Sequence, residues 1–287
     1  MNIQRIFSDI ADKDPEIFDR VSPRRATIRT FLRGASLAAL PVALGGLFKK
    51  AYGQSSPNLP LIIDTLNFAL MAEYLESEFY TRAMNTAVLT AQFDTYGVRA
   101  DVELLRQNEV AHRDLVIATI QKLGGTPVAK PNFDFTGGKG QGGGPFPDVL
   151  ANASTFFAVA QAFEENGVRA YKGQAPNLMS SNEVLTAALD IHSVEARHAS
   201  HVRKLRATKF GVAIKPWITG TESGISQAAA QPVYAGEDNT THAGVNLVTL
   251  PGATAGSTIS VSAATEAFDE PLTRAQVEAI LTNFIAP

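Results

Sequence analysis

The sequence contains no cysteine among its 287 residues. This absence excludes disulfide bonds, thiolate metal sites, iron–sulfur clusters and cysteine nucleophiles. Any bound metal ion must therefore be held by carboxylate and imidazole groups, a ligand set that suits iron, manganese or zinc. Histidine is also scarce, with five in the chain, and three of the five lie between His192 and His201. That short stretch is the first place to look for metal ligands.

The chain also lacks a strong excess of charge of either sign. Its net charge is −3, and 18% of its residues are charged. Apart from arginines near the N-terminus, no basic cluster is present that is typical of nucleic-acid binding, so we expect no nucleic-acid partner. The length and the 45% hydrophobic content predict a globular protein with one large domain, or a medium domain with appendages.

The first 53 residues predict an export signal. The apolar stretch 34–48, GASLAALPVALGGLF, is short for a transmembrane helix and typical of the apolar core of a signal peptide. Shortly before it lie Arg24, Arg25, Arg29 and Arg33, and the small residues of Ala51-Tyr52-Gly53 follow it. The pair Arg24-Arg25, followed by Phe31-Leu32-Arg33, resembles a twin-arginine signal, although more residues intervene than in the usual pattern. We therefore expect a periplasmic or cell-envelope protein that meets the membrane only through this signal; the alternative is a retained hydrophobic anchor.

Four segments after residue 60 have the periodicity of amphipathic helices. They cover residues 61–88, 98–123, 147–172 and 181–209. Gly124-Gly125 and Pro127 predict the end of the second helix, and Ser181 is a predicted N-cap for the fourth. The Gly-rich connection between the second and third helices exceeds twenty residues, which is typical of a long crossover between two antiparallel helix pairs. The sequence therefore predicts an all-α fold, with a four-helix bundle over residues 54–210.

Each of the four predicted helices carries a carboxylate within its apolar stripe: Glu73, Glu109, Glu164 and Glu195. Burial of one isolated carboxylate costs several kcal/mol, so four in one core require a positive partner. His112 and His198 lie three residues after Glu109 and Glu195, on the same helix faces. Four Glu and two His form the ligand set of di-iron and di-manganese carboxylate bundles, and we predict a pair of metal ions held by these six residues.

Residues 60–210 resemble the ferritin-like superfamily, and specifically the exported bacterial ferritin-like domain proteins related to desiccation-associated proteins. The segment 108–127, NEVAHRDLVIATIQKLGGTP, is similar to the second bundle helix of bacterioferritins and rubrerythrins. The segment 266–281, EAFDEPLTRAQVEAIL, resembles the ending of the desiccation-associated group. The resemblance implies a dinuclear site with two iron or two manganese ions.

Residues spaced seven apart in two of the helices extend this resemblance. Glu73 and Tyr80 have the spacing of the ligand Glu and the core Tyr in those families, and Glu164 and Tyr171 repeat it. This repetition favours Glu73 over its neighbour Glu76, and Glu164 over Glu165. We expect Tyr80 and Tyr171 to hydrogen-bond to ligand carboxylates. We also expect His192 to lie just outside the ligand set, by its rotation from Glu195.

Residues 211–287 have a different composition, rich in Thr, Ala, Gly, Val and Ser. The runs 245–250 and 257–263 are strand-like, and a short helix is predicted over 272–284 with Thr273 as a possible cap. We expect an irregular, partly β-like extension packed on the bundle, with Trp217 as an anchor.

Three functional hypotheses follow. The first is an exported dinuclear iron or manganese protein that protects against oxidative or desiccation stress, through peroxide or ferrous-iron oxidation or manganese-catalase-like chemistry. The second is a non-catalytic structural or stress-protective envelope protein. The third, an iron-storage cage, is disfavoured by the C-terminal extension. The expected partners are metal ions and small oxygen species, and a homo-oligomer is compatible with the sequence.

Overall fold

The computed structural model describes residues 56–253 and 256–287. The predicted export signal, residues 1–53, lies outside this part of the chain. Within the described residues, no helix combines the length and the apolar character that crossing a membrane requires.

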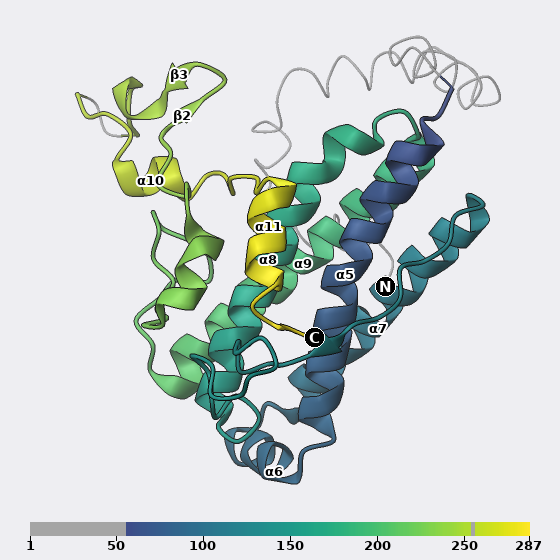
Figure 1. The fold of residues 1–287 in the computed structure, drawn as a ribbon. Helices are drawn as coiled ribbons and strands as arrows, with labels where there is room; N and C mark the ends of the chain where they lie inside the picture. The colour runs from purple at the N-terminus through teal and green to yellow at the C-terminus, as the bar shows by residue number, and fades with distance from the viewer. Residues whose placement is uncertain (1–55, 254–255) are drawn as a thin grey trace, which may run out of the picture. The chain divides into compact units, whose positions relative to one another are not determined.

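Four long helices form the bundle: α5 (Leu59–Met84), α7 (Arg99–Lys122), α8 (Ala153–Leu178) and α9 (Asn182–Phe210) (Figure 1). Helix α5 packs against α7, α8 packs against α9, and α5 also contacts α8. The segment 123–152 connects the two helix pairs and contains one two-residue strand, β1 (Asn132–Phe133). The predicted all-α bundle with one long crossover is therefore confirmed.

Three helix boundaries differ from those predicted, and one of them is the end of α8, at Leu178 rather than near 172. Helix α5 ends at Met84, and a separate helix α6 (Ala87–Tyr96) follows where the prediction placed the end of one longer helix. Helix α8 begins at Ala153 rather than near 147, because the Asn152 side chain accepts hydrogen bonds from the N–H groups of Ser154 and Thr155. The predicted cap Ser181 accepts from the N–H of Val184 at the start of α9.

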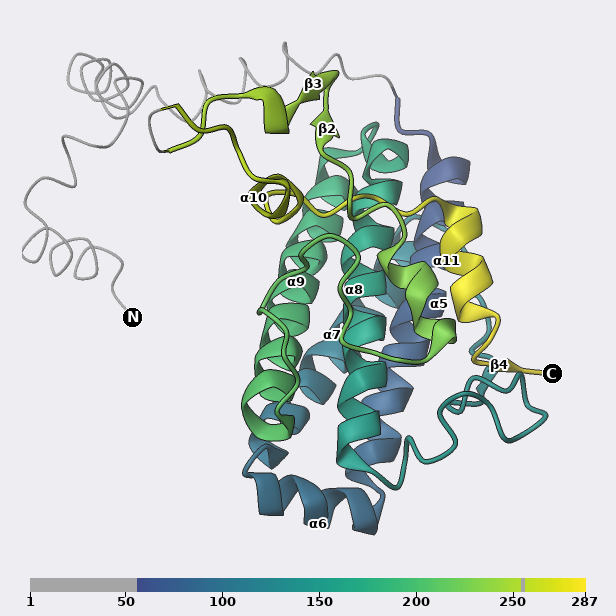
Figure 2. The same ribbon diagram turned by 90° about the vertical axis from the view of Figure 1, so that its left-hand side faces the viewer.

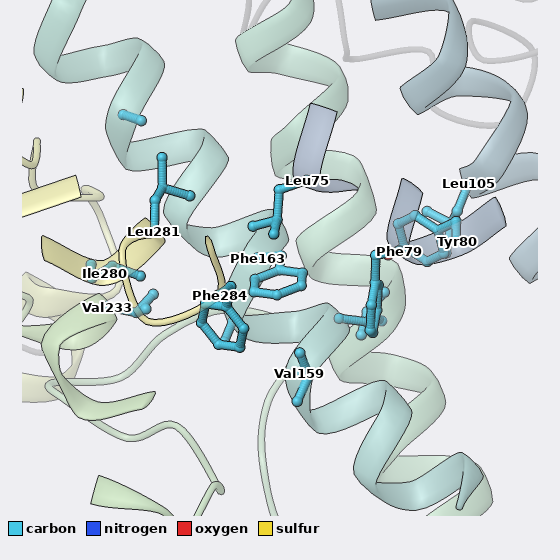
Figure 3. Close-up of a cluster of buried hydrophobic side chains, with 14 of the residues drawn as sticks. Leu75, Phe79, Tyr80, Leu105, Val159, Phe163, Val233, Ile280, Leu281 and Phe284 are labelled. Carbon is cyan, nitrogen blue, oxygen red and sulfur yellow. The ribbon is translucent and has the colours of Figure 1, made fainter. Parts of the chain in front are cut away.

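Aromatic side chains fill the core between α5, α8 and the C-terminal tail (Figure 3). The ring of Phe79 stacks on that of Phe156 with centroids 4.7 Å apart and meets the edge of Phe163 at 5.0 Å. Phe163 in turn contacts Phe284 at 4.8 Å. Strand β4 (Ile285–Ala286) pairs antiparallel with β1 of the crossover. The chain end therefore shares one core with the bundle.

The C-terminal extension combines short elements with irregular backbone (Figure 2). They are η1 (Ala228–Tyr234), β2 (Thr241–His242), β3 (Val245–Asn246), η2 (Leu247–Thr249), α10 (Val261–Thr265), α11 (Arg274–Leu281) and β4. The strand-like runs predicted from the sequence are mostly not strands: the first pairs only at β3, and the second passes into α10. The predicted cap Thr273 is confirmed, since it forms a capping box with Gln276 at the start of α11.

Three buried arginines of the bundle bind backbone carbonyl groups of the extension. Arg203 donates through Nε to the carbonyl oxygen of Lys215 at 2.7 Å and through Nη1 to Glu165 at 2.7 Å. Arg206 donates to the Gly224 carbonyl at 2.7 Å, and Arg169 to the Glu270 carbonyl at 2.7 Å. We call Arg169, Arg203 and Arg206 the arginine clamp.

Trp217, the predicted anchor, is 49% exposed, whereas the adjacent Ile218 is buried. Close backbone approach supplies a further attachment of the extension. The N–H of Leu272 donates to the Arg169 carbonyl at 3.1 Å, and a Cβ placed on Gly173 would lie 2.0 Å from the Leu272 carbonyl oxygen. Only glycine fits α8 at this crossing.

Candidate metal centre

Each of the four long helices contributes one fully buried glutamate to the centre of the bundle. Glu73 comes from α5, Glu109 from α7, Glu164 from α8 and Glu195 from α9, and each has an exposed fraction of 0%. His112 and His198 lie one helical turn after Glu109 and Glu195, with exposed fractions of 7% and 6%. The structure brings all six predicted ligand residues into one cluster, since residues three apart share a helix face.

The six residues form two overlapping groups of four. One group contains Glu73, Glu109, His112 and Glu195, and the other contains Glu109, Glu164, Glu195 and His198. Within each group, one oxygen or nitrogen atom from every residue lies within 4.8 Å of the others. Glu109 and Glu195 belong to both groups. The arrangement therefore fits two metal ions, with two carboxylates shared between them and one carboxylate and one imidazole belonging to each ion.

Both imidazole rings direct Nδ1 at the carboxylates. His112 Nδ1 lies 3.2 Å from Glu109 Oε2 and 3.0 Å from Glu195 Oε1. His198 Nδ1 lies 2.7 Å from Glu109 Oε1 and 3.2 Å from Glu164 Oε2. Nδ1 is therefore the ring atom that each histidine would offer to a metal ion.

Two tyrosines cross between α5 and α8 and hold carboxylates of the opposite helix. The hydroxyl of Tyr80 on α5 donates to Glu164 Oε1, and the hydroxyl of Tyr171 on α8 donates to Glu73 Oε1. Each tyrosine fixes one carboxylate oxygen and thereby orients the other toward the cluster, as partners of metal ligands do. Burial, together with the adjacent glutamate charge, raises the pKa of both hydroxyls well above the usual value, so both remain hydrogen-bond donors.

Burial and mutual repulsion strongly perturb the carboxylates. Burial, followed by the charge of Glu109, raises the pKa of Glu73 to about 8. The same two causes raise the pKa of Glu195 well above its usual value. Burial also acts to raise the pKa of Glu109, but its contacts with His112 and His198 outweigh burial and lower that pKa.

The pKa values of the two histidines are raised, although burial alone would lower them. Burial alone would lower the pKa of His112, but its contacts with Glu109 and Glu195 raise it to about 11. Burial is likewise outweighed at His198, where Glu164 and Glu109 raise the pKa to about 11. The cluster thus attracts positive charge strongly, whether that charge is carried by protons or by metal ions.

The hydrogen bonding of the carboxylates provides a test of the fit to metal ions. Among the described residues, Glu73 Oε2 and Glu195 Oε2 are buried without a hydrogen-bond partner, and Glu109 Oε1 and Glu195 Oε1 face the imidazole Nδ1 atoms of His198 and His112. Buried oxygens of this kind are costly unless a cation binds them. Two divalent ions would balance the four carboxylate charges and give these oxygens a partner. The residues present therefore fit a dinuclear metal site.

A fifth carboxylate, Glu76, is buried beside the cluster on α5. Burial, followed by the charges of Glu195 and Glu109, raises its pKa well above the usual value. Gly167 of α8 leaves space for these side chains, since a Cβ there would lie 2.9 Å from Glu195 Oε2 and 3.4 Å from Glu76 Oε1. Glu165, which the sequence disfavoured as a ligand relative to Glu164, pairs with Arg203 of the arginine clamp at 2.7 Å.

The structure does not bring His192 to the cluster, in contrast to the placement predicted from the sequence. Its Nδ1 lies 2.9 Å from the carbonyl oxygen of Val168, and its ring faces the backbone of α8. His192 shares a face of α9 with Glu195 but lies about one turn before it, where it meets the α8 backbone at Val168 instead of the carboxylates.

Asn108 is a partner of the cluster that the sequence did not indicate. Its amide nitrogen Nδ2 lies 3.0 Å from Nε2 of His198. If His198 binds a metal ion through Nδ1, Nε2 carries the ring proton, and the Asn108 amide turned by 180° presents its oxygen to accept it. Asn108 precedes Glu109 on α7 and reaches across to α9, a contact that no periodicity within α7 could reveal.

Comparison with protein-family models gives a match over residues 62–208 to a family described as ferritin-like domain. The matched region runs from α5 to near the end of α9 and contains all six residues of the cluster. Comparison with curated proteins gives no match.

Proposed function

The chain belongs to the ferritin-like domain family, and we propose that its six-residue cluster holds two iron or two manganese ions that react with peroxide or dioxygen. The observation that supports this proposal most directly is the convergence of four buried glutamates and two histidines from four helices. Oxygen and imidazole nitrogen ligands accept both metals, so the proposal includes both.

The residues of the cluster and its surroundings would have different roles at such a metal centre. Glu109 and Glu195, which belong to both groups of four, would hold both ions, while Glu73 and His112 would bind one of them and Glu164 and His198 the other. Bound iron or manganese supplies the redox electrons that reduction of peroxide or dioxygen requires. Tyr80 and Tyr171 keep two of the carboxylates oriented. Complete burial of the carboxylates limits the access of water to the reacting atoms.

A non-catalytic role as a structural or stress-protective envelope protein is the alternative. Burial of four carboxylates lowers the stability of a bundle unless cations compensate it, and apolar residues of similar volume would serve a pure scaffold better. The chemistry of the cluster therefore favours the metal-dependent proposal. The metal-dependent proposal includes two candidate reactions: removal of peroxide, as in a manganese catalase, and oxidation of ferrous iron.

Export and stress protection complete the proposal. The pair Arg24-Arg25, the apolar stretch 34–48 and the small residues after it support export through the twin-arginine pathway, which carries folded proteins. In a periplasmic or cell-envelope location, removal of peroxide or ferrous iron would protect against oxidative and desiccation stress. Replacement of both arginines by lysine is expected to keep the protein inside the cell, and unchanged export would contradict this part.

The metal content of the purified full chain tests the central proposal. We expect about two equivalents of iron or manganese per chain, and a loss of both in Glu109→Gln. The matched control is Glu103→Gln on the same helix, since Glu103 pairs with Arg106 away from the cluster. Folded protein that takes up neither metal would contradict the proposal. Peroxide consumption and ferrous oxidation by the loaded protein then distinguish the two reactions.

A further inference from the structure

A cleft of about 500 Å³ lies between α7 and α9. Leu104, Asn108 and Ala111 line it from α7, and Val194 and Arg197 line it from α9. His112 and His198 also line the cleft, and through their Nδ1 atoms they contact the buried carboxylates. The cleft and the metal centre therefore share these two imidazole rings as a wall.

The exposed fractions of the six residues also indicate that the cluster is closest to solvent at its two histidines. His112 and His198 retain exposed fractions of 7% and 6%, whereas the four glutamates have none. Of the six, the two histidines are the ones that line this cleft. The imidazole rings of His112 and His198 therefore lie between the cleft and the buried carboxylates.

The opposite sides of the centre are covered by packed side chains. Between α5 and α8, the rings of Phe79, Tyr80 and Phe156 are fully buried and contact one another. On the side that faces the C-terminal extension, Arg169 of α8 and Arg203 of α9 hold the extension in place. Helices α7 and α9, in contrast, are joined near the cleft by the hydrogen bond between Asp101 and His201 at 2.8 Å.

We infer that this cleft is the entrance through which divalent metal ions and small oxygen species reach the six-residue cluster. The inference rests on the proposed function of that cluster. Six water molecules around an ion occupy about 180 Å³ at the volume that each water takes in the liquid, so a hydrated ion fits the cleft. The lining combines one acidic and one basic side chain, Asp101 and Arg197, with apolar side chains, so neither sign of charge predominates against the passage of small cations or neutral oxygen species.

Filling the cleft tests the entrance. Ala111 lines the cleft on an exposed position of α7, and Ala111→Trp would place an indole in it. Leu104→Trp would narrow the cleft from a position that is 59% exposed and more than one turn from His112. The matched control is Ala118→Trp, also exposed on α7 but outside the cleft.

Uptake of Co²⁺ by the metal-depleted full chain gives the readout, followed by the absorption of the bound ion after rapid mixing. We expect Ala111→Trp to load at least tenfold more slowly than the wild-type chain and to reach the same final two equivalents. Ala118→Trp is expected to load at the wild-type rate. If Ala111→Trp lowers the final stoichiometry, the indole has displaced His112, and the rate of Leu104→Trp then decides.

Two results would overturn the inference in distinguishable ways. Loading of both cleft variants at the wild-type rate, with two ions bound at the end, would exclude this entrance and leave the proposed metal centre intact. A wild-type chain that binds neither Co²⁺ nor iron or manganese would overturn the proposed function, and the entrance with it.

Discussion

Replacement of Gly167 by alanine separates the metal affinity of the centre from the stability of the fold. A Cβ at this position would lie 2.9 Å from Oε2 and 3.3 Å from Cδ of Glu195. Contacts between carbon and oxygen atoms in packed interiors are longer than this, so the carboxylate must withdraw by about half an ångström. Glu195 is the ligand of α9 that both metal groups share, and its displacement affects both ions.

The substitution is expected to lower the metal affinity more than it lowers the stability of the metal-free fold. Metal–ligand distances hold to within about 0.2 Å, so a shift of half an ångström weakens binding by roughly 10–100-fold, the range seen when the support of a ligand is lost. This corresponds to about 1.4–2.7 kcal/mol less stabilisation by saturating metal. Alanine is favoured over glycine within a helix by roughly 0.5–1 kcal/mol, which offsets part of the strain in the metal-free protein.

Chemical unfolding of the full chain with and without Mn²⁺ measures both effects. We expect Gly167→Ala to keep most of its metal-free stability and to lose most of the added stability that Mn²⁺ confers on the wild-type protein. Unchanged Mn²⁺ affinity would refute the reasoning. Gly173→Ala on the same helix is the contrasting variant, because its Cβ would meet the Leu272 carbonyl at 2.0 Å. That substitution is expected to release the extension to proteolysis while Mn²⁺ binding persists.

Three further outcomes follow from the contacts of single side chains. Asn108→Leu leaves Nε2 of His198 without its partner, and Mn²⁺ titration is expected to show an affinity about tenfold weaker, whereas an unchanged affinity would contradict the role of Asn108. Arg203→Met leaves the buried Glu165 without its charged partner, and the free energy of unfolding measured in urea is expected to fall by about 3–5 kcal/mol. A fall of less than about 1 kcal/mol would show that the pair contributes little to stability. The affinity for Mn²⁺ is expected to rise with pH between 6 and 8, because His112 and His198, with pKa values of about 11, must release protons before Nδ1 can bind, and a pH-independent affinity would contradict this. The same raised pKa values stabilise the metal-free fold fully below pH 6.5, and this contribution is lost as the pH rises through about 11.

The bundle was predictable because helical periodicity and buried charge are both local in the sequence. Glu109 and His112 lie three residues apart within an apolar stripe, and this spacing alone placed them on one face of a helix. Hydrogen bonds from Tyr80 and Tyr171 to ligand carboxylates were expected, and the structure adds their partners on the opposite helices, Glu164 for Tyr80 and Glu73 for Tyr171. The choice of these partners depends on the contacts between α5 and α8.

The features that the sequence did not indicate depend on contacts between distant segments. No periodicity within α7 singles out Asn108, and its role appears only when α7 lies against α9. Arg203 and Arg206 follow the ligand stripe of α9, and their burial depends on the extension that packs over them. Helix α6 was missed because Asn85 ends α5 within a stretch of otherwise uninterrupted helical residues.

A crystal structure of the full chain grown with Mn²⁺ or Fe²⁺, with anomalous diffraction measured at the metal edge, tests the central claim most directly. We expect two anomalous peaks inside the bundle, both contacted by Glu109 and Glu195, one by Glu73 and His112, and the other by Glu164 and His198. Two-metal sites of this kind have separations of roughly 3.5–4 Å. A single peak, or metal bound only at the surface while these glutamates stay without a cation, would contradict the account.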